Sequence, residues 1–271
     1  MPESFGGILR TLLVKRWDIE GEAPPAGRFG EVALGRGRLP AGILAPVGTF
    51  CVDTTDRVFA LTYDDGPDPK STPGVLEVLA QQHAKATFFV LSEQARRSPR
   101  LVERIVADGH ELALHGRDHR SLLTLSTRAA IAAIRDARAV VEDIAGRPVH
   151  LFRPPYGEHT LAQAVAIRRI GLSVVIWSGA AQDWVDDAED AVVARAVTAV
   201  FPGAILLLHD TRADPDTLAP GESLPTFDRA QVLERILGAT RQAGFAEFVA
   251  GELMARYPTV RSLARERMHK K

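Results

Sequence analysis

Apolar and polar positions follow two different spacings from residue 58 onward. Short runs rich in β-branched and aromatic residues alternate with longer segments of helical period, a pattern that predicts βα units and a parallel sheet. We expect strands at 58–65, 86–91, 111–116, 150–155, 173–179, 204–210 and 246–253. Helices are expected at 73–82, 98–108, 127–145, 160–170, 188–200 and 228–243. The strands are almost continuously apolar, so both faces of the sheet should be buried.

This order of elements fits two architectures, a (β/α) barrel and an open doubly wound sheet. Both place functional residues beyond the C-terminal ends of the strands. The polar residues at such positions are Asp64 and Asp65, His115 and His119, Arg153, Asp183 and Trp184, and His209 and Asp210. The pattern therefore predicts one polar site at that end of the sheet.

The remaining segments carry less regular patterns. The glycine- and proline-rich stretches "GEAPPAG" and "GRGRLPAG" predict loops around one or two short strands. We predict an N-terminal extension at 1–57 that packs on a catalytic domain at 58–271. The polar segment 210–228 predicts a long loop that shapes the binding site.

Composition and charge exclude several classes of protein. With 271 residues, 46% hydrophobic and 25% charged, the chain is typical of a globular protein. A formal net charge of -1 provides no basic surface for nucleic acid or anionic lipid, and it favours a neutral or mixed substrate. The single cysteine, Cys51, excludes an internal disulfide framework and a cysteine-based zinc site, so a metal here would need histidine and carboxylate ligands.

The N-terminal segment does not have the pattern of a secretory signal. Glu3 precedes its apolar run, Arg10 lies within it, and no small-residue cleavage site follows. No uncharged stretch reaches the roughly 18 residues that a membrane-spanning helix needs. We expect a cytoplasmic protein without a membrane span, with an extracytoplasmic location left open for a longer natural chain.

Two adjacent carboxylates, Asp64 and Asp65, end the first apolar run and are followed by a turn. Like charges side by side cost stability unless a cation or a proton relieves them, although Asp-Gly-Pro is also ordinary turn chemistry. His115 and His119 are four residues apart, a spacing that brings both imidazoles to one side of a helical turn. Two histidines and Asp65 would leave coordination positions open, as catalytic zinc sites do, and the same set accepts cobalt, manganese or iron. A structural histidine pair is the alternative.

Five short motifs, read in order, make a more specific pattern. "TYDDGP", "HGRDH", "FRPPYG", "QDW" and "LLLH" resemble the five motifs of the polysaccharide deacetylase family, the NodB-type carbohydrate esterases of family 4. The resemblance spans residues 58–253. It implies a distorted (β/α)7 barrel and a metal-dependent hydrolase that removes N-acetyl groups from N-acetylglucosamine-containing poly- or oligosaccharides of the chitin or peptidoglycan type.

The resemblance implies a role for each matching residue. Asp65, His115 and His119 correspond to the ligands of a divalent metal, zinc in the first place. Asp64 corresponds to the base that takes a proton from the attacking water. Arg153 is similar to the arginine that pairs with this base and aims it.

The last three motifs imply the other half of the site. The backbone N–H of Tyr156 would bind the oxyanion of the tetrahedral intermediate. His209 would protonate the departing amine, and Asp183 would hold its ring and stabilise the imidazolium. Trp184 would form one wall of the sugar pocket, and Leu207 would lie near the acetyl methyl group.

The chain departs from the family pattern at two positions. Gly116 stands where the family usually has serine or threonine, whose hydroxyl steadies the metal loop, and Tyr63 stands where it usually has phenylalanine. Two other functions fit the same residues, namely hydrolysis of a non-sugar amide or cyclic ureide, and glycan binding by an inactive barrel. A phosphatase of the haloacid dehalogenase type would need an aspartate where Gly66 stands.

Overall fold

The computed structural model describes residues 12–14, 47–214 and 218–262. The strands are β1 (Leu12–Val14), β2 (Thr49–Val52), β3 (Val58–Asp64), β4 (Thr87–Leu91), β5 (Glu111–Gly116), β6 (Leu151–Phe152), β7 (Ser173–Val174), β8 (Gly179–Ala180), β9 (Ala204–His209), β10 (Ala246–Phe248) and β11 (Thr259–Ser262). The α-helices are α3 (Thr72–Gln81), α4 (Ser92–Arg97), α5 (Pro99–Ala107), α6 (Thr127–Ala145), α7 (Leu161–Arg169), α8 (Glu189–Thr198), α9 (Arg229–Gln242) and α10 (Ala250–Arg256). Two 3-10 turns, η2 (Leu122–Thr124) and η3 (Pro155–Gly157), complete the described elements.

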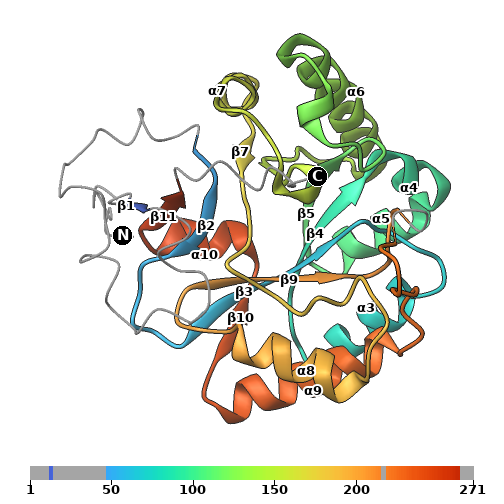
Figure 1. The fold of residues 1–271 in the computed structure, drawn as a ribbon, viewed down its shortest axis with the longest axis vertical. Coiled ribbons are helices and arrows are strands. Elements are labelled where there is room, and N and C mark those ends of the chain that lie inside the picture. Colours follow the sequence, from blue (N-terminus) through green and yellow to red (C-terminus); the bar gives the residue numbers. More distant parts are fainter. Residues whose placement is uncertain (1–11, 15–46, 215–217, 263–271) are drawn as a thin grey trace.

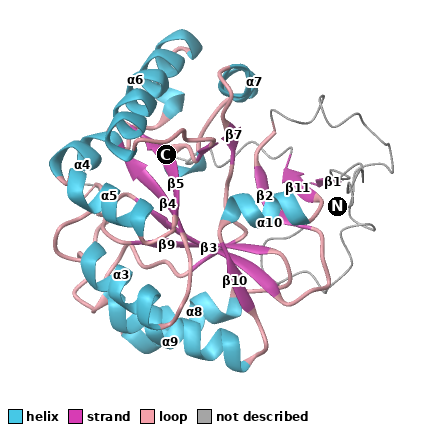
Figure 2. Cartoon of the chain, turned by 180° about the vertical axis from the view of Figure 1, so that it is seen from behind, coloured by secondary structure: helices cyan, strands magenta, loops and turns pink. Residues whose placement is uncertain are grey.

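One curved sheet organises the molecule, with the order β1-β11-β2-β9-β3-β4-β5-β6-β7. From β9 to β7 neighbouring strands run parallel, and β10 adds a parallel partner to the first half of β3. Helices α3 to α9 form an arc around these strands, as Figures 1 and 2 show from opposite sides. The predicted α/β class with a mainly parallel sheet is therefore confirmed.

The segment from β7 to β8 brings the sheet back on itself. β7 pairs with β6, whereas β8, five residues further on, pairs with β9. Between them, Val175 forms a bridge to Thr49 of β2, and the Ile176 amide donates to the Thr49 carbonyl at 2.7 Å. This part of the chain therefore closes the barrel in an irregular way, with β2 inserted between β7 and β9.

The side chains of the strands alternate between the two faces of the sheet. In β3, Phe59 and Leu61 pack with the residues under the outer helices, whereas Val58 and Ala60 pack inside with Phe89 and the neighbouring strands. Helix α10 covers the inner apolar cluster with Ala250 and Leu253. Thr62 and Asp64 continue the inner face of β3 toward its C-terminal end because strand side chains have period two. The interior of the barrel thus becomes polar at that end.

Several predicted elements differ in extent from the structure. The strand expected at 150–155 ends at Phe152, since Pro154 and Pro155 have no amide hydrogen for a ladder. The strand expected at 173–179 is divided between β7 and β8, and the one expected at 246–253 changes to helix α10 at Ala250. Short apolar runs do not distinguish a strand from a buried helix, which explains the last error.

Some elements lay outside the predictions altogether. Helix α4 and strand β11 were not expected, and β11 joins β2 to β1. Most of the predicted extension at 1–57, including both predicted loops, lies outside the described residues, so its boundary stays a prediction. In the part of the chain that the structure describes, no helix is long and apolar enough to cross a membrane.

Candidate active site and metal-ligand set

The first strand of the barrel delivers two carboxylates in different directions. Asp64 ends β3, and Asp65 has a left-handed φ of 77°, which turns its side chain away from the alternation of the strand. At Gly66 a Cβ atom would come within 2.2 Å of the Asp210 carboxylate, so only glycine fits this turn. The sequence Asp-Asp-Gly therefore turns two neighbouring carboxylates in different directions.

Three side chains converge next to this turn. Asp65 Oδ1 lies 3.4 Å from Nε2 of His115 and 3.3 Å from Nε2 of His119. One ligand atom from each residue lies within 4.8 Å of the others. Asp65 Oδ1 is buried, and no group of the described residues donates a hydrogen bond to it. An oxygen of this kind, facing two imidazole nitrogens, fits a divalent cation that would satisfy all three.

The local structure of "HGRDH" differs from the predicted helical turn. His115 lies near the end of strand β5. The backbone then bends, with φ angles of 111° at Gly116 and 55° at His119. The two imidazoles still meet, with ring centroids 5.1 Å apart. The spacing predicted the proximity correctly, but a bend after the strand produces it.

Charge in this set follows from the close contacts. Burial alone would raise the pKa of Asp65, but the charge of His119 and the close contact with His115 lower it below its usual range. Burial alone would lower the pKa of His119, and the Asp65 and Asp214 carboxylates raise it above its usual range. These contacts therefore favour an anionic Asp65 carboxylate next to imidazoles that carry a positive charge or bind a metal.

Asp64 is held by the most deeply buried cation of the described chain. Asp64 Oδ1 accepts a hydrogen bond from Arg153 Nη1 at 2.6 Å, and the Arg153 side chain has no exposed surface. The guanidinium also donates to Thr62 Oγ1 at 2.9 Å and lies over the ring of Phe89, 4.0 Å from its centroid. The other oxygen, Asp64 Oδ2, lies 3.6 Å from Nε2 of His115. One oxygen is thus fixed and the other faces the ligand set.

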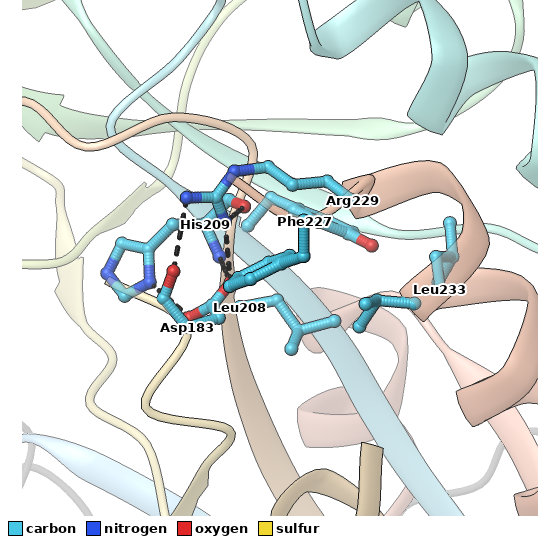
Figure 3. Close-up of a pocket in the computed structure, with 8 residues that line it drawn as sticks. Asp183, Leu208, His209, Phe227, Arg229 and Leu233 are labelled. Atoms are coloured by element: carbon cyan, nitrogen blue, oxygen red, sulfur yellow. Dashed lines mark hydrogen bonds and ion pairs between the residues drawn. The ribbon is translucent and has the colours of Figure 1, made fainter. Parts of the chain in front are cut away.

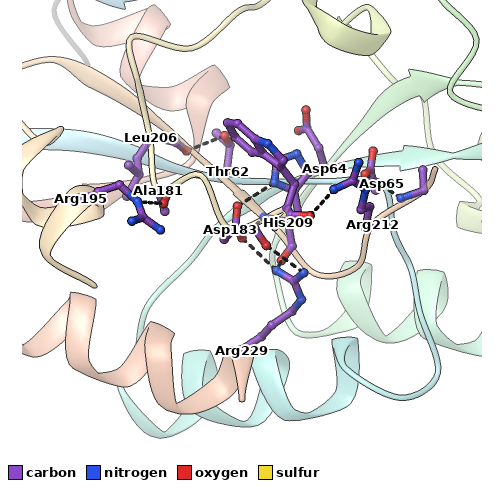
Figure 4. A network of polar contacts seen from close by, with 12 residues as sticks. Thr62, Asp64, Asp65, Ala181, Asp183, Arg195, Leu206, His209, Arg212 and Arg229 are labelled. Atoms are coloured by element: carbon purple, nitrogen blue, oxygen red, sulfur yellow. Dashed lines mark hydrogen bonds and ion pairs between the residues drawn. The ribbon is translucent and has the colours of Figure 1, made fainter. Parts of the chain in front are cut away.

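A second pair of groups lies on the neighbouring strand. Residues Asp64 and His209 are paired in the β3–β9 ladder. His209 Nδ1 lies 2.8 Å from Asp183 Oδ1, and Asp183 Oδ2 accepts from the His209 amide at 2.7 Å and from Arg229 at 3.0 Å. Figure 4 shows Arg229 bridging Asp183 and the backbone of His209. The imidazole is therefore fixed through Nδ1, which leaves Nε2 for a reaction.

The environment of His209 favours its charged form. Burial alone would lower its pKa, but the charge of Asp183, the hydrogen bond to it and the charge of Asp65 raise the pKa to about 9. Trp184 lies edge-on to the imidazole, with centroids 5.6 Å apart. At neutral pH His209 is accordingly an imidazolium, which can act as a proton donor.

A small cavity lies behind this pair. It is lined by Tyr63, Asp183, Leu208, His209, Phe227, Arg229, Val232 and Leu233, which Figure 3 shows as sticks. None of the three residues of the ligand set lines it. The hydroxyl of Tyr63 is buried and has no hydrogen-bond partner among the described residues. We therefore assign this cavity to the packing behind the Asp183–His209 pair and not to the substrate site.

The remaining predicted residues lie around these groups. Tyr156 follows Arg153 in the turn η3 with φ 58° and ψ 7°, and its side chain is exposed. Leu207 is buried in β9, and Trp184 is partly buried. All ten predicted site residues therefore belong to the C-terminal ends of the strands or to the loops that follow them. Their proximity agrees with the roles assigned to them, which stay predictions.

Comparison with known proteins finds a matching family model and several related proteins. The polysaccharide deacetylase family model matches residues 52–175. A chitooligosaccharide deacetylase of Sinorhizobium fredii is 37% identical over 186 residues, which cover 68% of this chain and 86% of that protein. The chain belongs to the polysaccharide deacetylase family. A peptidoglycan-N-acetylglucosamine deacetylase of Bacillus cereus is 34% identical over 171 residues, covering 62% of this chain and 80% of that protein.

The structure of the peptidoglycan deacetylase PdaC from Bacillus subtilis has the same fold. The TM-score is 0.64 at 27% identity, and the match covers 74% of this chain and 91% of that one. The distorted (β/α)7 barrel of the polysaccharide deacetylase family, predicted from the motifs, is thereby confirmed. The family is metal-dependent, in agreement with the ligand set of Asp65, His115 and His119.

Family membership gives the two departures from the motifs a structural meaning. Gly116 has φ 111°, a conformation in which a side chain would be strained, so this chain follows a glycine-specific path into the metal loop. Tyr63 stacks on Phe88, with centroids 5.3 Å apart, as a phenylalanine would. Tyr63 also lines the cavity behind Asp183, and its extra hydroxyl is buried.

Three contributors to this deacetylase site were not predicted from the sequence. Arg229 begins helix α9, and Arg212 and Asp214 lie in the loop after β9. Asp214 accepts hydrogen bonds from His119 and from Tyr156, residues far apart in the sequence. No spacing pattern distinguishes these three residues from other charged loop residues, so only the fold reveals them.

Proposed function

We propose that this chain is a metal-dependent hydrolase that removes N-acetyl groups from N-acetylglucosamine-containing poly- or oligosaccharides. The observation that supports it is the convergence of Asp65, His115 and His119 beside a second, separately held carboxylate, Asp64. A metal site of this composition leaves positions open for water and substrate. The names of the chitooligosaccharide and peptidoglycan deacetylase relatives support an N-acetylated glycan as substrate.

We propose zinc as the cation, bound by Asp65, His115 and His119, although cobalt, manganese or iron would also suit these ligands. When bound, the metal supplies a Lewis acid that polarises the acetyl carbonyl and makes water a stronger nucleophile. The protein contributes the orientation of its own ligands. His115 Nδ1 lies 2.8 Å from the carbonyl oxygen of Arg153, which selects the tautomer with a free Nε2.

Asp64 then acts as the general base. Arg153 holds its Oδ1, so Oδ2 is the oxygen that takes a proton from the attacking water. The water oxygen bonds to the acetyl carbon, and the charge that develops on the carbonyl oxygen is met by the backbone N–H of Tyr156. Because Arg153 is buried and held by several acceptors, the base keeps its direction during the reaction.

His209 completes the reaction as the general acid. Its Nδ1 hydrogen is bound by Asp183, so Nε2 gives its proton to the sugar nitrogen as the carbon–nitrogen bond breaks. The products are acetate and a glucosamine unit with a free amine, and one water is consumed. We propose that Trp184, edge-on to His209, forms a wall of the sugar pocket and that Leu207 lies near the acetyl methyl group.

Measurement of acetate release tests this function. Chain stripped with a chelator and restored with zinc, cobalt or manganese is incubated with N-acetyl chitooligosaccharides, peptidoglycan fragments and cyclic ureides. We expect acetate from at least one glycan, dependent on restored metal. Turnover of a ureide without acetate from any glycan would replace the substrate class. A chain that binds no divalent metal and hydrolyses none of these would instead be an inactive barrel.

Asp187→Asn is the matched control for this assay. Asp187 is an exposed aspartate three residues after the "QDW" motif, and its carboxylate pairs with Arg195 at 2.6 Å and accepts from the Ala188 amide, neither of which has a role proposed above. We expect its acetate release to equal that of the wild type within about twofold, since surface ion pairs contribute little. Loss of activity in this variant would show that the assay reports general instability.

A further inference from the structure

The loop after strand β9 touches both sides of the site through one tripeptide, Arg212–Asp214. The amide of Ala213 donates to Asp65 Oδ2 at 2.9 Å. The next residue, Asp214, accepts hydrogen bonds at Oδ2 from His119 Nδ1 and from the hydroxyl of Tyr156. Two consecutive residues of this polar loop, Ala213 and Asp214, therefore contact two members of the ligand set and the proposed oxyanion donor.

The contact of Asp214 with His119 has a defined chemical effect. An imidazole that binds metal through Nε2 must carry its hydrogen on Nδ1, and a carboxylate acceptor at Nδ1 fixes that tautomer and increases the basicity of Nε2. His115 has a backbone carbonyl in this place. The two histidines thus differ, because one is fixed by the main chain and the other by a charged side chain from a loop.

The same carboxylate oxygen connects His119 with Tyr156. The two rings lie edge-on with centroids 4.4 Å apart, and both polar groups point to Asp214 Oδ2. Tyr156 has a left-handed backbone that is unusual for a residue with a Cβ atom. A hydrogen bond from its hydroxyl to Asp214 restrains the side chain and, with it, the direction of the backbone N–H.

The tripeptide itself is anchored on the other wall of the site. Arg212 donates from Nη1 to the Trp184 carbonyl at 2.5 Å and from Nε to the Asp214 carbonyl at 3.1 Å. This guanidinium thus fixes the backbone of Asp214 relative to the segment that carries Asp183. The hydrogen bonds of Arg212 therefore restrain the loop segment that carries the Asp214 carboxylate.

We propose that Asp214 is a positioning residue of this deacetylase, which holds His119 for metal binding and couples this ligand to Tyr156. The inference rests on the proposed metal-dependent function. In this role Asp214 is not itself a metal ligand, and it acts through the two groups that donate to its Oδ2. Its removal should therefore weaken metal binding and turnover without changing the ligand set.

Zinc affinity of the full chain, measured by competition with a chelating indicator, tests whether Asp214 holds His119 for metal binding. For Asp214→Ala we expect affinity to fall about 10–100-fold, the usual effect of removing such a partner of a ligating histidine. Asp214→Asn keeps an acceptor but removes the charge, so it should lose less. The control Asp187→Asn should match the wild type. Asp214→Ala with affinity within about twofold of the wild type would overturn the proposal.

Tyr156→Phe tests the coupling to Tyr156, because this substitution removes the hydroxyl and keeps the backbone N–H. We expect kcat to fall about three- to tenfold, with zinc affinity and KM within about twofold, since transition-state binding alone is affected. A parallel loss of zinc affinity, or an unchanged kcat, would contradict the coupling to Tyr156.

Nitrogen NMR of His119, recorded on metal-free protein at a pH where its imidazole is neutral, separates this inference from the proposed function. We expect the Nδ1–H tautomer in the wild type and a mixture of tautomers in Asp214→Ala. If the wild type neither binds zinc nor releases acetate, the proposed function fails, while the tautomer still reports on Asp214. An unchanged tautomer in the alanine variant refutes the positioning role whatever the activity of the wild type.

Discussion

At the scale of single residues, two adjacent aspartates have different environments. Asp65 has a buried oxygen without a hydrogen-bond donor among the described residues, whereas Asp64 is held by Arg153 at 2.6 Å. A carboxylate oxygen without a donor suits a metal, and a carboxylate held by a buried guanidinium suits proton transfer. The different roles that we propose for the two residues therefore rest on what each oxygen contacts.

Asp64→Asn tests this separation. The amide keeps the size of the side chain but cannot take a proton from water, so we expect kcat to fall by about 10²–10⁴. Zinc content should stay equal to that of the wild type because Asp65, His115 and His119 remain. The measurement is acetate release together with metal analysis of the same preparation. A variant with turnover close to that of the wild type would remove Asp64 as the base.

Asp183→Asn tests the origin of the charge on His209. Asp183 raises the pKa of His209, so its replacement should lower that pKa from about 9 toward the ordinary value. His209 would then lose its proton at lower pH, and the alkaline limb of the kcat profile should shift to lower pH with it. We expect turnover at pH 8 to fall by about ten- to a hundredfold. An unchanged alkaline limb would show that another group donates the proton.

The residues themselves could be predicted to a large extent from the sequence. Asp64, His115, Arg153 and His209 stand directly at strand ends, and a strand end fixes where its next side chain goes. Arg229 and Asp214 could not be predicted, since a helix start and a long loop bring them to the site only through the completed fold. Local patterns carry information about local geometry, and these two contacts join residues far apart in the sequence.

At the scale of elements, regular βα units were predicted better than the segment that closes the barrel. Helix α6 agrees with the expected range 127–145, because Ser126 caps its start and Gly146 ends it in a left-handed conformation. The run 173–179 was expected as one strand. In the structure its first part, β7, pairs with β6, and its end, at the start of β8, pairs with β9. Closure of a barrel is a property of several strands together, and no single run of apolar residues contains it.

Strand β9 and helix α3 are joined through a buried acid, Asp210. Its side chain accepts a hydrogen bond from Thr72 at the start of α3, and its carbonyl accepts one from Ser71. Burial raises the pKa of Asp210 from 3.8 to about 7. The folded protein therefore holds a proton on Asp210 between about pH 4 and pH 7, where the unfolded chain has lost it.

This difference predicts the direction of a pH effect on stability. Rising pH removes the proton preferred by the folded state, so the contribution of Asp210 is full below about pH 4 and is lost by about pH 7. Asp210→Asn has no such proton and keeps an acceptor for Thr72. We expect the wild type to lose on the order of 2–4 kcal/mol relative to the variant between pH 4.5 and 7.5. Urea unfolding of both metal-free proteins at the two pH values measures it, and a constant difference would contradict the buried acid.

At the scale of the whole molecule, the ligand set joins parts of the chain that are separate in the sequence. Asp65 follows β3, and both histidines belong to β5 and the bend after it. Ala213 and Asp214 add the loop after β9. A cation bound by this set would connect three strand ends of the barrel. Metal that binds only the folded chain must therefore stabilise the whole fold.

The melting temperature measured with and without metal tests this connection. At a free zinc concentration of about 100 times the dissociation constant, the stabilisation is about 2.7 kcal/mol, which corresponds to a rise of about 5–10 °C for a chain of this size. His115→Ala should lose this rise, because one carboxylate and one imidazole bind zinc weakly, whereas Asp187→Asn should keep it. The same rise in His115→Ala would place the metal elsewhere. No rise in the wild type would mean that these three side chains do not hold a cation, whatever their proximity.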